Sequence, residues 1–122
     1  MFGRLLGRAA ATEAVSTATA GARTTFYRGV SKAELADIEA TGALRSVTGA
    51  QGKYLAATAP EAAVFGERAL ALTGESLGGV IRVQLGRGAA RDVTALGRID
   101  GIGEAFFAPL SALTNARITI LP

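Results

Sequence analysis

Two short motifs, each a hydroxyl residue followed three positions later by glutamate, divide the first part of the sequence into alternating strands and helices. Ser31 precedes Glu34, and Thr58 precedes Glu61. In such a capping box the hydroxyl accepts a hydrogen bond from the backbone N–H of the glutamate at the start of a helix. Each motif follows a stretch of β-branched or aromatic residues typical of a strand. The motifs therefore predict the order strand, helix, strand, helix.

The spacing of apolar residues, together with glycine and proline positions, predicts most of the helices and strands beyond residue 23. Glycines at 42 and 74 mark the expected helix ends, and Pro109 is expected to end the penultimate strand. Residues 91–100 show neither the helix pattern nor the strand pattern. We expect helices at 32–41 and 59–73, and strands at 24–30, 53–57, 80–85, 104–109 and 117–121. Short helices between short strands, with a strand-rich second half, predict a mixed α+β domain.

Residues 1–22 lack this pattern and consist mainly of Ala, Thr, Ser and Gly, with Glu13 interrupting the apolar stretch. We expect residues 1–22 to form an Ala-rich leader or linker, and residues 23–122 to form one catalytic domain. No apolar stretch approaches the roughly 18 residues that a membrane span needs. The sequence therefore predicts no membrane span.

The chain of 122 residues contains no cysteine and no histidine. These absences exclude disulfides, zinc ribbons, thiol nucleophiles and catalysis by an imidazole base, and they lead us to expect no metal. The net charge is +3, with 13 basic and 10 acidic residues. The arginines are scattered rather than clustered, so nucleic acid is compatible with the charge but is not the favoured partner.

Two charged residues stand out by their positions. Arg28 lies near the end of the first predicted strand, between Tyr27 and Gly29. A guanidinium among apolar strand residues either points to solvent or meets an anion. Glu104 follows the glycine-rich turn GIG, where a ligand can approach closely, although it is also compatible with an ordinary loop glutamate. Taken alone, neither residue establishes a site.

In their order and spacing these features resemble the mono-ADP-ribosyltransferase family, in particular the Arg-Ser-Glu branch of small bacterial toxin domains. The matching segments are FYRG at 26–29, KYLAAT at 53–58 and GEAFFAP at 103–109, followed by the strand ARITI at 116–120. The family's other branch has a histidine in the first strand, which this chain lacks. The segment YRGVSKAEL at 27–35 also resembles the C-terminal tips of large secreted (Rhs-type) polymorphic toxins.

The resemblance implies a compact ADP-ribosyltransferase-like fold, with short helices packed on two small, mostly antiparallel sheets. It implies NAD as a substrate and no metal. It assigns catalysis to Arg28 and Glu104, and NAD binding to Arg28, Tyr27, Gly29, Tyr54 and Thr58. The family's middle strand usually opens with three hydroxyl residues, and in the corresponding stretch here, residues 56–58, only Thr58 keeps a hydroxyl.

The resemblance further implies a secreted or delivered effector that acts in the cytoplasm of a target bacterium. It would transfer ADP-ribose to a macromolecule, either a protein such as a translation or division factor or an RNA, and would have a cognate immunity protein. Ile102 stands where arginine-modifying members carry Glu or Gln, which leaves the acceptor open. Three alternatives also stay open: an NAD glycohydrolase, a small histidine-free ribonuclease, and a non-enzymatic module that binds an anionic partner.

Overall fold

The computed structural model describes residues 23–45 and 51–122. The predicted leader, residues 1–22, lies outside the described residues. The α+β prediction is confirmed. The elements are β1 (Arg23–Ser31), α1 (Lys32–Thr41), β2 (Gly52–Ala56), α2 (Ala59–Ala71), β3 (Leu77–Gly86), α3 (Arg87–Ala90), β4 (Thr94–Ile99), β5 (Gly103–Pro109), α4 (Leu110–Leu113) and β6 (Arg117–Ile120).

Both capping hydroxyls act as predicted. Ser31 Oγ accepts the backbone N–H of Glu34 at 3.1 Å, and Thr58 Oγ1 accepts that of Glu61 at 3.3 Å. Gly42 ends α1 with φ of 72°, a left-handed conformation that glycine adopts without steric cost. Helix α2 ends at Ala71, a little earlier than expected, and the unassigned residues 91–100 contain β4. Local signals therefore located most elements.

Within the described residues, six strands form one antiparallel sheet in the order β4-β5-β2-β1-β3-β6, rather than the two small sheets expected. Strand β1 pairs with β3 along its whole length, from Arg23 to Ser31. Its register with β2 consists of a single pair, Tyr27 with Ala56. This pair joins two three-stranded halves, and beyond it β1 and β2 diverge. The sheet is therefore continuous but has a narrow join at its centre.

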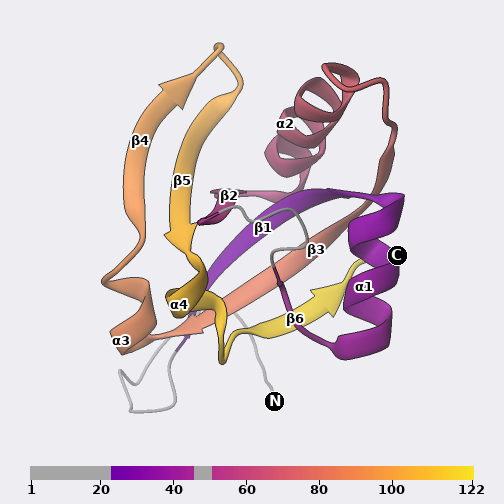
Figure 1. The fold of residues 1–122 in the computed structure, drawn as a ribbon. Coiled ribbons are helices and arrows are strands. Elements are labelled where there is room, and N and C mark those ends of the chain that lie inside the picture. The colour runs from indigo at the N-terminus through magenta and orange to yellow at the C-terminus, as the bar shows by residue number, and fades with distance from the viewer. Residues whose placement is uncertain (1–22, 46–50) are drawn as a thin grey trace.

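The helices lie on both faces of this sheet (Figure 1). Side chains alternate between the faces of a strand, so one face carries the core residues of β1 and β3. Helices α1, α3 and α4 contribute to this core, whose fully buried residues include Val30, Ile81, Val83, Leu85 and Leu113. Helix α2 packs against the other face, over β1 and β3. The core therefore occupies one face, and α2 is the main cover of the other.

Two glycines allow α2 to lie directly on β1. A Cβ atom on Gly66 of α2 would come 2.9 Å from the Cα atom of Gly29, and a Cβ atom on Gly29 would come 2.5 Å from the carbonyl oxygen of Ala62. Neither site leaves room for a methyl group without movement of backbone. This close contact places α2 directly over Gly29, the residue that follows Arg28 in β1.

We expect Gly66→Ala to destabilise the protein by about 1–3 kcal/mol, because the clash with β1 outweighs the higher helix propensity of alanine. Gly88→Ala in α3 is the matched control, since a Cβ atom there meets nothing within 4 Å. The control should be neutral or stabilising, by about 0.5–1 kcal/mol at most. Denaturant unfolding measures both, and equal effects at the two glycines would contradict the packing argument.

Candidate functional site

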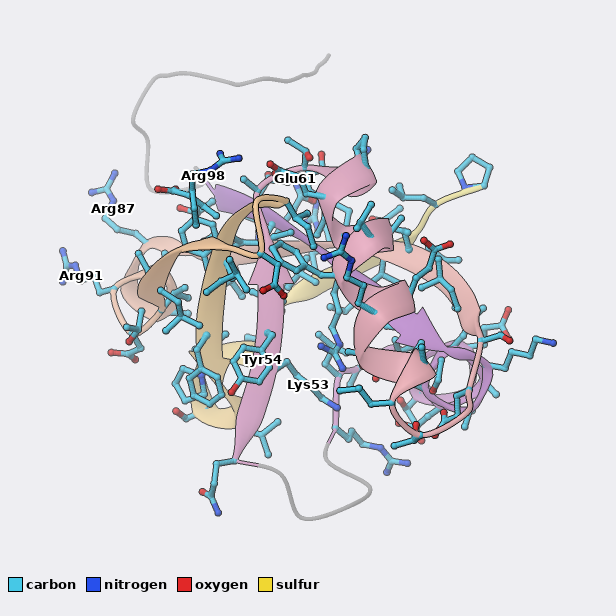
Figure 2. All side chains as sticks on the ribbon, turned by 90° about the horizontal axis from the view of Figure 1, so that it is seen from above. Lys53, Tyr54, Glu61, Arg87, Arg91 and Arg98 are labelled. Atoms are coloured by element: carbon cyan, nitrogen blue, oxygen red, sulfur yellow. The ribbon has the colours of Figure 1, made fainter. Side chains whose placement is uncertain are left out.

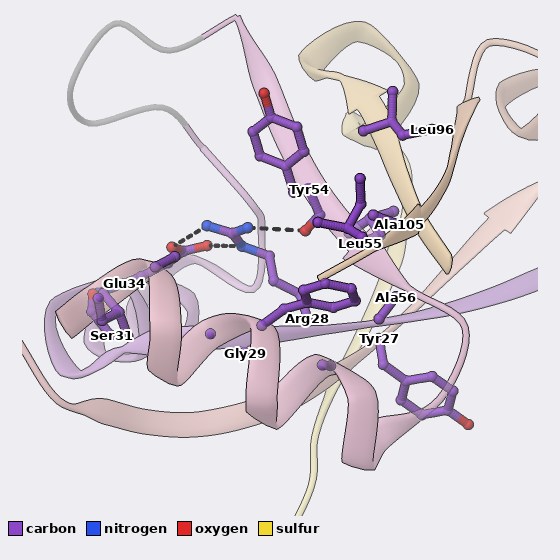
Figure 3. Close-up of a pocket in the computed structure, with 16 residues that line it drawn as sticks. Tyr27, Arg28, Gly29, Ser31, Glu34, Tyr54, Leu55, Ala56, Leu96 and Ala105 are labelled. Atoms are coloured by element: carbon purple, nitrogen blue, oxygen red, sulfur yellow. Dashed lines mark hydrogen bonds and ion pairs between the residues drawn. The ribbon is translucent and has the colours of Figure 1, made fainter. Parts of the chain in front are cut away.

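A pocket of about 360 Å³ opens where β1 and β2 diverge, between α2 and the β4–β5 hairpin. Most of its wall is apolar: the apolar side chains are Leu55, Ala56, Ala62, Phe65, Ala69, Leu70, Leu96, Ile99 and Ala105. Its polar groups come from β1, the start of α1 and β2. The close-up in Figure 3 shows these groups gathered around Arg28. The pocket therefore combines apolar walls with one concentrated polar region.

Arg28 links the two halves of the sheet. Its Nε and Nη2 donate to the two carboxylate oxygens of Glu34, at 2.8 and 2.9 Å. Its Nη1 donates to the backbone oxygen of Tyr54 in β2, at 3.0 Å (Figure 3). Arg28 thus spans the gap between β1 and β2 just beyond their single pair, and the guanidinium is held by protein acceptors on two sides.

Glu34 lies between two cations in a largely buried cluster. The side chains of Arg28 and Glu34 are 19% and 15% exposed, and Lys53 Nζ lies 3.6 Å from Glu34 Oε2. Burial acts to raise the pKa of Glu34, but hydrogen bonds from Arg28 and the charges of Arg28 and Lys53 outweigh it and hold the pKa below its ordinary value of 4.5. Glu34 is therefore ionised at neutral pH, and the three side chains together carry a formal charge of +1.

Four of the residues predicted to contact NAD line the pocket: Tyr27, Arg28, Gly29 and Tyr54. In Figure 3 the Tyr27 ring points away from the Arg28 guanidinium. Tyr54 is 62% exposed and packs its ring at an angle against Phe107, with centroids 5.3 Å apart. Tyr54 therefore offers an aromatic surface at the rim of the pocket.

The other two predicted site residues, Thr58 and Glu104, do not line the pocket. The Thr58 hydroxyl accepts the N–H of Glu61 and donates to its Oε1 at 3.0 Å, so it caps α2. Glu104 is exposed, and strand alternation turns it away from the face to which Gly103 and Ala105 belong. The structure brings the pocket residues together without Glu104, whose catalytic role stays a prediction.

Sequence reasoning missed Glu34 and Lys53 as members of the site. Glu34 was explained by the capping box, in which the glutamate side chain returns to the N-cap backbone. Here the carboxylate binds Arg28 instead. One feature of the sequence could have indicated Glu34. Ser31 is both the last residue of β1 and the N-cap of α1, so Arg28, three residues earlier in the strand, lies close to the first turn of the helix. Lys53 carried no comparable signal.

Two arginines at the ends of α3 lie away from the cluster of Arg28, Glu34 and Lys53. In Figure 2 Arg87 and Arg91 extend outward from α3, on the side away from Lys53. Within residues 23–45 and 51–122 no three His, Cys, Asp or Glu side chains are grouped to hold a metal. None of the helices in these ranges is long and apolar enough to span a membrane.

Comparison of the chain with protein-family models, curated proteins and solved structures gave no match. Support for a function therefore comes from the residues of the pocket and from the sequence motifs.

We expect Glu34→Gln to lower the free energy of unfolding at pH 7 by about 1–3 kcal/mol, because it removes a hydrogen-bonded, largely buried carboxylate. The pKa of Glu34 is lowered by folding, so its contribution is complete above pH 4.5 and is lost as the pH falls through the lower folded-state value. The difference between variant and wild type should shrink over that range. Urea unfolding at several pH values measures it, with Glu61→Gln from the other capping box as control; a difference independent of pH would contradict this account.

Proposed function

We propose that residues 23–122 form an NAD-dependent mono-ADP-ribosyltransferase domain of an effector toxin, and that NAD binds in the pocket beside Arg28. The observation that carries the proposal is the convergence of Tyr27, Arg28, Gly29 and Tyr54 on one pocket. These are four of the five residues that the family resemblance assigns to NAD. They come from two strands that are well separated in the chain, so their meeting is a property of the fold.

The pocket suits part of a dinucleotide. Its volume of about 360 Å³ is near the lower end for small-molecule sites, which fits a nucleoside-sized group with the rest of the ligand extending over the rim. Arg28 offers planar N–H groups suited to a pyrophosphate. The apolar wall from α2 suits a nicotinamide ring, and the exposed ring of Tyr54 can stack on a base at the rim.

The proposed reaction breaks the bond between ribose C1′ and the nicotinamide nitrogen. Nicotinamide leaves with the bonding electron pair, and positive charge develops on the ribose. A nucleophilic group of the acceptor then bonds to C1′ and loses its proton. A carboxylate near the ribose stabilises the oxocarbenium-like state, so the reaction needs no histidine, thiol or metal.

Glu104 is the proposed carboxylate. Both oxygens of Glu34 accept hydrogen bonds from Arg28, so Glu34 is already engaged. Glu104 precedes Ala105, which lines the pocket at the β5 end. Because the Glu104 side chain leaves the opposite face of β5 from Ala105, this arrangement requires the ribose to lie beyond the rim of the pocket, on the exposed side of β5, with the pyrophosphate at Arg28. The remaining predicted contact, Thr58, caps the helix that forms the opposite wall.

The proposed biological role is that of a delivered effector which modifies a protein or an RNA in the cytoplasm of a target bacterium and is inhibited by a cognate immunity protein. The test is incubation of the protein with adenylate-labelled NAD and a bacterial lysate, followed by gel electrophoresis. A labelled macromolecule is expected. Free ADP-ribose alone would indicate a glycohydrolase. RNA fragments formed without NAD would indicate a ribonuclease. Capture of an anionic partner without turnover would indicate a binding module.

Arg28→Lys keeps the positive charge but loses the planar fork, and we expect it to weaken NAD binding at least about tenfold. Isothermal titration calorimetry with NAD measures the change. Arg45→Lys, at an exposed arginine that pairs with Asp37, is the control and should leave affinity unchanged. Unaltered affinity in both Arg28→Lys and Arg28→Ala would show that NAD does not bind at Arg28.

Glu104→Gln should lower NAD turnover roughly a hundredfold, because it removes the charge that stabilises the developing cation. NAD affinity and melting temperature should change little, since Glu104 is exposed and Arg28 lies on another strand. Glu67→Gln on the exposed side of α2 is the control. If Glu104→Gln retained full turnover while Glu61→Gln abolished it, the assignment of the carboxylate would be wrong.

A further inference from the structure

Only some of the N–H groups of the Arg28 guanidinium donate hydrogen bonds to the protein. A guanidinium has five N–H groups. Within the described part of the chain, three of them donate to Glu34 and to the Tyr54 oxygen. One N–H on each terminal nitrogen is left for a ligand. Glu34 takes the edge formed by Nε and Nη2, so the remaining Nη2 N–H lies on a different edge of the guanidinium plane.

Glu34 is itself fixed more firmly than a surface glutamate. Its backbone N–H is bound by Ser31 Oγ at 3.1 Å, which anchors it in the first turn of α1. Lys53 Nζ lies 3.6 Å from its Oε2, and Lys53 is only 8% exposed. A free arginine side chain populates many rotamers, and ordering it on binding a ligand costs entropy. A fixed carboxylate that binds the guanidinium through two parallel hydrogen bonds removes most of that cost in advance.

We propose that Glu34 is a positioning residue, whose carboxylate fixes the Arg28 guanidinium so that its remaining N–H groups face the anionic part of the ligand. This inference rests on the proposed NAD-dependent function of the same pocket. Glu34 acts through Arg28 and touches no reacting atom. Because Lys53 adds a second positive charge, the cluster still attracts an anion when Glu34 is ionised.

A competing role for Glu34 predicts the opposite effect on binding. If its carboxylate occupied Arg28 and competed with the ligand, removing its negative charge would strengthen anion binding and lower the KM for NAD. If it positions Arg28, removing it frees the guanidinium and raises the KM. The sign of the change in KM therefore separates positioning from competition.

The experiment uses the full chain with NAD as the probe, at a temperature where circular dichroism shows every variant to be folded. Glu34→Gln should raise the KM about tenfold and leave kcat within about threefold, since a pyrophosphate contact is made equally in the ground and transition states. Glu34→Asp, which keeps the charge but shortens the reach, should recover part of this loss. Asp37→Asn is the matched control. Asp37 lies on the same helix as Glu34 but pairs with Arg45, so this substitution should leave KM unchanged.

A double substitution tests whether Glu34 acts through Arg28. In the Arg28→Lys background, Glu34→Gln should change the KM by less than about threefold, because the fork that it positions is already absent. A lower or unchanged KM in Glu34→Gln, with active wild type, would overturn the positioning role. A loss of melting temperature without a change in KM would assign Glu34 a structural role only. Wild type without any NAD turnover would instead refute the proposed function, and the positioning role with it.

Discussion

The contact of Arg28 with Glu34 and with the Tyr54 oxygen is the interaction on which both the sheet and the pocket depend. Strands β1 and β2 share one pair, and Arg28 spans the gap where they separate. The same guanidinium ties the first turn of α1 to this junction. Removing Glu34 leaves the largely buried Arg28 guanidinium without its counter-ion, which is costly. In the proposed function, stability and ligand recognition are therefore coupled at this ion pair.

The apolar surroundings of this ion pair support the role proposed for it. Helix α2 contacts β1 through the glycine pair Gly29 and Gly66, and it faces the β4–β5 hairpin across the pocket. Small and aliphatic side chains make up most of the pocket wall, and electrostatic interactions are stronger where the local dielectric constant is low. A pyrophosphate at Arg28 would be bound by few groups, but by groups already in place. This is the property that a site for a nucleotide ligand requires.

The two carboxylates at the centre of the proposals differ in environment, and the difference suits different roles. Glu34 is largely buried, ionised, and hydrogen-bonded through both oxygens. Glu104 is exposed, in a strand whose neighbouring residues 103 and 105 face the other way. A carboxylate already bound to an arginine orients that arginine, whereas one without such a partner can face a developing cation. Substitution of each one separately distinguishes these assignments.

Much of the local structure could be predicted from the sequence alone, as could Arg28 and three other residues of the pocket, Tyr27, Gly29 and Tyr54. The capping motifs at Ser31 and Thr58 and the glycine after α1 rely on hydrogen bonds between residues three or four apart, so they can be read without knowledge of the fold. Only the tertiary structure decided the join of the two half-sheets, the approach of Lys53 to Glu34 and the direction of Glu104. These depend on pairing between distant strands and on its register, and a shift of one residue turns every side chain of a strand to the opposite face.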